Sequence, residues 1–219
     1  MSDDPKNSIA PSGERFFLAM VAGLGLLAGF CFWYAFRPAT ALASKNEFAP
    51  DRDRALVSFV LTNQTGRAVS QAELDGKYLV VDFLLTSCSL TCREVNRHMG
   101  EIQQLTANQP DVRLVSLTVD PREDTVPVLA DYGTNFGTNP DRWLLLTGDK
   151  TILYHLISTS FLNQDLNDPF SYMPGNFSHT DRMALVDARG RVRMYFDGLS
   201  DDVATNVVNA IARLRKKPL

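Results

Sequence analysis

YLVVDFLLTSCSLTC, residues 78–92, joins a nearly uninterrupted apolar run to two cysteines. An apolar run rich in strand-forming residues, such as residues 78–85, is typical of a strand buried on both faces of a sheet. The residues from about 90 to 107 then predict a helix that ends near Pro110. The two cysteines are therefore expected where a buried strand ends and a helix begins.

Strand and helix patterns alternate on both sides of this segment. Strands are predicted at residues 56–61, 78–85, 112–119, 143–146, 183–186 and 192–196, and helices at 90–107, 125–136, 150–157 and 201–215. This order predicts an α/β protein with a mixed central sheet flanked by helices, and it contains the order of a thioredoxin-like fold. Such a fold does not by itself specify a function.

The N-terminal part contains an apolar segment, residues 16–36, that has no charged residue. A helix of this length spans roughly 30 Å, the thickness of the hydrocarbon core of a bilayer. We predict a transmembrane anchor there, between a short tail (1–15) and a linker (37–54). A cleaved signal peptide is the alternative, because Ala41-Leu42-Ala43 fits a cleavage site, although signal peptides usually have apolar runs of only about 7–15 residues. The remaining residues, 55–219, have the size of one domain.

The composition excludes several classes of protein. The chain has 219 residues, of which 45% are hydrophobic, and a formal net charge of −3. It can therefore form a core, and it lacks the positive charge typical of nucleic-acid-binding proteins. Three cysteines are too few for a small disulfide-stapled protein. We interpret Cys31, which lies in the apolar segment, as a small apolar residue.

Cys88 and Cys92 are four positions apart at the predicted start of a helix, so they are expected on one face. The free N–H groups and the positive end of a helix favour thiolates. Two adjacent thiolates can form a disulfide or bind a soft metal such as Cu(I) or Zn. The spacing has one residue more than the C-x-x-C of common oxidoreductases. A purely structural disulfide is less favoured, because so short a loop contributes little chain entropy.

A metal held by two thiolates needs a further ligand, and His179 is the best candidate in the sequence. It lies in a polar loop before the predicted hairpin, although a lone histidine is more often a hydrogen-bonded scaffold group. His98 is about 9 Å along the helix from Cys92 and roughly 120° around it, so it is not expected to join the site. His155 is expected to face solvent or the core, and Met173 to serve in packing.

Three motifs occur in a fixed order in the domain. They are Cys88 and Cys92 as C-x-x-x-C, the stretch TVDPREDT at residues 118–125, and His179 ahead of a strand that ends in the D-x-x-G turn at residues 187–190. With these motifs the chain resembles the Sco/SenC family of membrane-anchored copper chaperones. The resemblance covers the residues from about 56 to 213.

The resemblance implies a thioredoxin-like fold that binds copper through Cys88, Cys92 and His179, as Cu(I), with Cu(II) held if another ligand joins. It also implies delivery of copper to the Cu(A) site of cytochrome c oxidase. The domain is then expected in the periplasm, anchored to a bacterial inner membrane, or alternatively in the mitochondrial intermembrane space. Proline often follows each family cysteine, and this chain has Ser89 and Arg93 instead.

Other functions use the same cysteine pair. The main alternative is a membrane-tethered thiol–disulfide oxidoreductase that reduces the cysteines of a metal-receiving partner, which does not require His179. A peroxidase with Cys88 as the attacking thiol is less favoured, since a resolving cysteine only four positions away is unusual. A redox sensor that signals to a membrane partner is a further alternative.

Overall fold

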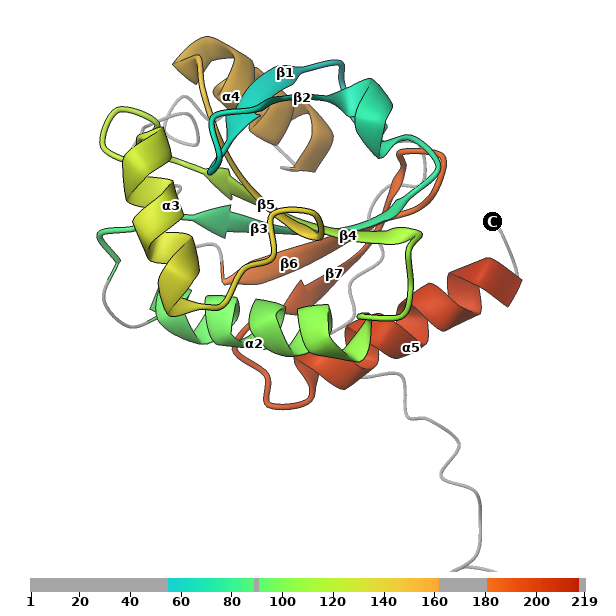
Figure 1. Cartoon of the computed structure of the whole chain (residues 1–219). Helices are drawn as coiled ribbons and strands as arrows, with labels where there is room; N and C mark the ends of the chain where they lie inside the picture. The colour runs from blue at the N-terminus through green and yellow to red at the C-terminus, as the bar shows by residue number, and fades with distance from the viewer. Residues whose placement is uncertain (1–54, 89–90, 162–180, 217–219) are drawn as a thin grey trace, which may run out of the picture. The chain divides into compact units, whose positions relative to one another are not determined.

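The computed structural model describes residues 55–88, 91–161 and 181–216 (Figure 1). The predicted anchor at residues 16–36 lies outside these ranges, together with the predicted tail and linker. Within the described ranges, no helix combines the length and the apolar character needed to cross a membrane.

The described residues form one mixed sheet with helices on both faces. The strands are β1 (Val60–Asn63), β2 (Ala68–Ser70), β3 (Tyr78–Leu84), β4 (Val112–Thr118), β5 (Trp143–Thr147), β6 (Arg182–Val186) and β7 (Val192–Asp197). The helices are α2 (Thr91–Leu105), α3 (Val126–Asn135), α4 (Lys150–Leu156) and α5 (Val203–Lys216), with a 3₁₀ turn η1 (Gln71–Leu74) and a π-helical turn η2 (Ile157–Phe161). The α/β class and the mixed central sheet are confirmed.

The order of the strands is β2-β1-β5-β4-β3-β6-β7. The pairs β3–β4 and β4–β5 are parallel, whereas β1 and β6 add antiparallel strands on either side. Leu84, the last residue of β3, lies opposite Thr118, the last residue of β4. This register brings the start of the TVDPREDT stretch beside the segment that leads to Cys88.

Alternation along β3 separates two apolar layers. Leu79, Val81 and Phe83 pack in the layer that contains α4, and Val80 and Leu84 pack in the layer that contains α2, α3 and α5. Figure 1 shows α2 and α5 together on one side of the sheet and α4 on the other. β3 is therefore buried on both faces, as its apolar run predicts.

The first strand begins later than predicted. We expected a strand at residues 56–61, but β1 begins at Val60. The N–H group of Leu56 donates to the carbonyl of Gly190 at 2.8 Å, and that of Val57 to Ser160 Oγ at 3.1 Å. These N–H groups therefore bond to the β6–β7 turn and to η2 instead of continuing the ladder.

Candidate metal centre

The cysteine turn, residues 85–88, follows β3, and Cys92 is the second residue of α2. The N–H group of Cys88 donates to the carbonyl of Leu85 at 3.1 Å, which closes the turn. Both cysteines are half-buried and reduced. The two side chains form a hydrogen bond with each other, so the structure brings the predicted pair together.

The electrostatics of Cys92 differ from the expectation for a helix start. Burial raises the pKa of the Cys92 thiol, and the hydrogen bond and the charge of Cys88 raise it further. A backbone hydrogen bond in the turn lowers this pKa but does not compensate for the loss of solvation. The expectation that the helix end favours thiolates is therefore wrong for Cys92, because the effect of burial is larger. A metal that binds there must displace its proton, so affinity is expected to rise with pH.

The side chain of Asp124 links the cysteine turn to the TVDPREDT stretch through hydrogen bonds. It is fully buried. Both the N–H group and the hydroxyl of Thr86 donate to Asp124 Oδ1, and the hydroxyl of Thr118 donates to Oδ2. One carboxylate thus joins the residue two positions before Cys88 to the end of β4. The motif has a structural role that the sequence pattern did not reveal.

Replacing Asp124 with alanine is expected to lower the free energy of unfolding by about 2–3 kcal/mol, because the hydroxyls of Thr86 and Thr118 lose their buried acceptor. Urea denaturation measures this change. The adjacent, exposed Glu123 provides the control, and Glu123→Ala is expected to change stability by less than about 0.5 kcal/mol. Equal effects of the two substitutions would contradict this role for Asp124.

A second buried carboxylate, Asp82 of β3, lies in the same layer as α2. Ser116 Oγ donates to its Oδ1, and Trp143 Nε1 donates to Ser116 Oγ at 2.8 Å. Asp82 Oδ2 is buried and has no hydrogen-bond partner among the described residues. Burial raises the pKa of Asp82 to about 7, against the lowering effect of Ser116, and its charge contributes to the raised pKa of Cys92. The available sequence signal was a carboxylate inside an otherwise apolar strand.

The remaining site predictions have different outcomes. His98 is fully buried and donates from Nδ1 to the carbonyl of Gly198 at 2.8 Å, so its ring is held within the core of the fold. His155 is exposed on α4. His179 and Met173 lie outside the described residues. Within the described part of the chain, no group of three or more His, Cys, Asp or Glu side chains is placed to hold a metal.

Solved structures share this fold. A SCO1/SenC family lipoprotein from Bacillus anthracis str. Ames has a TM-score of 0.62 and 25% identity, covering 74% of this chain and 96% of that one. BsSco, described with a disulfide switch and as a member of the Sco family of cytochrome c oxidase assembly proteins, has a TM-score of 0.57 and 26% identity over 74% and 96%. ScoI of Bradyrhizobium japonicum, solved with copper bound, has a TM-score of 0.56 and 23% identity over 74% and 98%.

The sequence comparisons agree with the structural ones. The SCO1 protein homolog of Bacillus subtilis (strain 168) is 36% identical over 157 residues, which cover 69% of this chain and 80% of the homolog. The family model described as SCO1/SenC matches residues 49–215. This range includes the cysteine turn, the TVDPREDT stretch and His179. The chain therefore belongs to the SCO1/SenC family.

Proposed function

We propose that this protein is a copper metallochaperone that binds copper through Cys88, Cys92 and His179. The observation that carries the proposal is the pair of reduced, half-buried thiols that contact each other between β3 and α2. Thiolates are preferred ligands of Cu(I), and copper is bound in structures of related fold. Copper is here the cargo of the protein. His179 is included on the strength of the family motif.

The proposed destination of the copper is the Cu(A) site of cytochrome c oxidase. BsSco is described as belonging to a family of assembly proteins for that enzyme, which supports this part of the proposal. The domain would act from the periplasmic side of a bacterial inner membrane, anchored by residues 16–36, or alternatively in the mitochondrial intermembrane space. The anchor would hold the cysteine pair close to a membrane-bound client.

A thiol–disulfide oxidoreductase is the second candidate function. The contact between the two thiols favours it, since a pair this close can interconvert between dithiol and disulfide. In that role the pair would reduce the cysteines of the receiving partner before metal is inserted. The two functions differ in their need for His179.

A Cu(I) titration of the full chain under reducing conditions tests the proposal. The wild-type chain is expected to bind one equivalent, and His179→Ala is expected to weaken binding by more than about 100-fold, beyond the loss typical of an outer-shell partner. The exposed His155 provides the control, because His155→Ala should leave the affinity unchanged. Full reductase turnover by a His179→Ala chain that no longer holds copper would favour the oxidoreductase instead.

A further inference from the structure

Charged residues are distributed unevenly between the two ends of the sheet. The end at which β3 and β4 begin, here named the basic end, comprises residues 75–77, 106–111, 187–191 and 213–216. These segments contain six Lys or Arg residues and three Asp residues. The basic end therefore carries positive charge, although the chain as a whole has a formal net charge of −3.

Contacts between these segments hold them together at that end. The N–H group of Gly76 donates to the carbonyl of Ala188 at 3.2 Å, which joins the β6–β7 turn to the segment before β3. Arg215 of α5 forms an ion pair with Asp111 at 2.7 Å, and its guanidinium lies 5.5 Å from the ring centre of Tyr78. The last turn of α5 therefore packs against the starts of β3 and β4.

The positive charge of the basic end faces solvent. Asp187, an anion of this end, already accepts from Arg193 of β7 at 2.6 Å. Cations in the last turn of a helix are common because they complement the helix dipole, which accounts for part of the charge on α5. The dipole does not account for Arg189 and Arg191, which are exposed on the β6–β7 turn. These two arginines therefore need another explanation.

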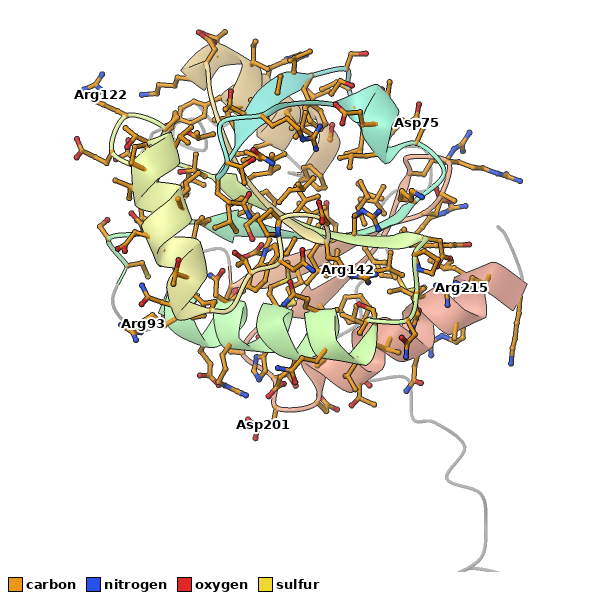
Figure 2. The ribbon with its side chains drawn as sticks, viewed as in Figure 1. Asp75, Arg93, Arg122, Arg142, Asp201 and Arg215 are labelled. Carbon is orange, nitrogen blue, oxygen red and sulfur yellow. The ribbon has the colours of Figure 1, made fainter. Side chains whose placement is uncertain are left out.

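The opposite end of the sheet, which carries the cysteine pair, has the reverse charge. It comprises residues 85–93, 119–125, 148–150 and 197–202. These segments contain seven Asp or Glu residues and three Lys or Arg residues. Figure 2 shows Arg93 and Arg122 on that side of the domain and Asp75 and Arg215 on the other. β3 spans about 20 Å between the two ends. A negatively charged surface would thus attract the basic end and repel the cysteine end.

The chain enters the described domain at the basic end. Ala55 pairs with Arg191 in an antiparallel bridge, and the N–H group of Leu56 donates to the carbonyl of Gly190 at 2.8 Å. The predicted linker, residues 37–54, can extend over roughly 60 Å at most. A domain tethered to a membrane by this linker therefore stays near the lipid headgroups, and the tether joins it at its positively charged end.

We propose that the basic end docks on the anionic lipid headgroups of the membrane, with Arg189 and Arg191 in contact with lipid phosphates. An arginine guanidinium can bind a phosphate through paired hydrogen bonds. Each cation within a Debye length of an anionic bilayer, about 8 Å at physiological salt, adds to the attraction. The docked domain presents the cysteine pair on the side away from the bilayer. The inference uses the anchor of the proposed function but not its copper site.

Energy transfer from Trp143 to dansyl-labelled phosphatidylethanolamine tests the docking. Trp143 begins β5 at the basic end, and Trp33→Phe makes it the single tryptophan of the full chain. This chain is incorporated into nanodiscs of phosphatidylcholine, either alone or with one-third phosphatidylglycerol. Transfer is expected to be at least about twofold greater in the anionic discs. At about 1 M salt, where the Debye length is about 3 Å, it is expected to fall to the value in neutral discs.

Arg189→Gln combined with Arg191→Gln is expected to remove at least about half of the increase in transfer, because the docked surface loses two cations. Lysine at both positions keeps the charge and is expected to retain most of the increase. The matched control combines Arg93→Gln with Arg122→Gln, which removes the same charge from exposed arginines at the opposite end. That control is expected to retain the full increase.

Equal transfer in neutral and anionic discs, or equal effects of the two glutamine variants, would overturn the docking proposal. An increase that persists at high salt would also overturn it, because the contact would then not be electrostatic. A Cu(I) titration of the chain with Arg189→Gln and Arg191→Gln is expected to give one equivalent. Failure of the wild-type chain to bind Cu(I) would refute the proposed copper site and leave the result on docking unchanged.

Discussion

Copper binding is expected to fall from one equivalent to none when Cys88 and Cys92 are both replaced by serine. Serine hydroxyls are poor ligands for Cu(I), whereas thiolates bind it strongly, and His179 alone offers a single nitrogen. Either single substitution is expected to abolish stoichiometric binding as well. Metal analysis of the purified full chain under reducing conditions measures the loss.

Cys31 provides the control for this experiment. It belongs to the apolar segment predicted to be the anchor, so Cys31→Ser is expected to leave one equivalent of copper bound. Far-ultraviolet circular dichroism should show the same secondary structure in all the variants. A double variant that still binds one copper tightly would show that the metal site lies elsewhere in the chain.

Asp82→Asn is expected to change the free energy of unfolding in a pH-dependent way. Its effect at pH 8 should be more stabilising than its effect below pH 4 by about 4 kcal/mol. Burial raises the pKa of Asp82 from 3.8 to about 7, so the folded state binds the proton more tightly than the unfolded state. The wild-type chain is therefore free of the cost of a buried charge below pH 4, and its stability falls as the pH rises from 4 to 7. Asparagine does not ionise, and its amide oxygen can still accept from Ser116.

Urea denaturation of both chains between pH 4 and 8 measures this difference. The unpartnered amide nitrogen of the variant lowers the free energy of unfolding by the same amount at every pH, so it does not affect how stability changes with pH. Asp141→Asn, at an exposed position, provides a control for the loss of one surface carboxylate. Identical pH profiles for the wild-type chain and Asp82→Asn would show that Asp82 does not titrate in this range.

The strand and the helix that carry the two cysteines were predictable, because each is marked by a pattern of neighbouring residues in the sequence. The run at residues 78–85 predicted a strand buried on both faces, and β3 has this burial. The cysteines were placed correctly because the strand end and the helix start are both marked in the sequence. β2 was not predicted, since its three residues are too few to show a periodic pattern.

The side-chain network behind the cysteines was not predictable from local patterns. Asp124 bonds to Thr86 across 38 positions, and Asp82 bonds to Ser116 across 34. Such pairs form only when strands meet in the sheet, so no window of sequence contains both partners. The pKa of Cys92 was mispredicted for a related reason, because helix geometry is local whereas loss of solvation depends on the whole packing.

The indole of Trp143 ends a chain of hydrogen bonds that runs through Ser116 to Asp82. Emission from an indole responds to charge in its surroundings, so this fully buried ring can serve as an optical reporter for the buried carboxylate of Asp82. Fluorescence of the Trp33→Phe chain would follow Trp143 alone and record proton uptake at Asp82. The same signal would register changes in charge when the thiols ionise to receive metal.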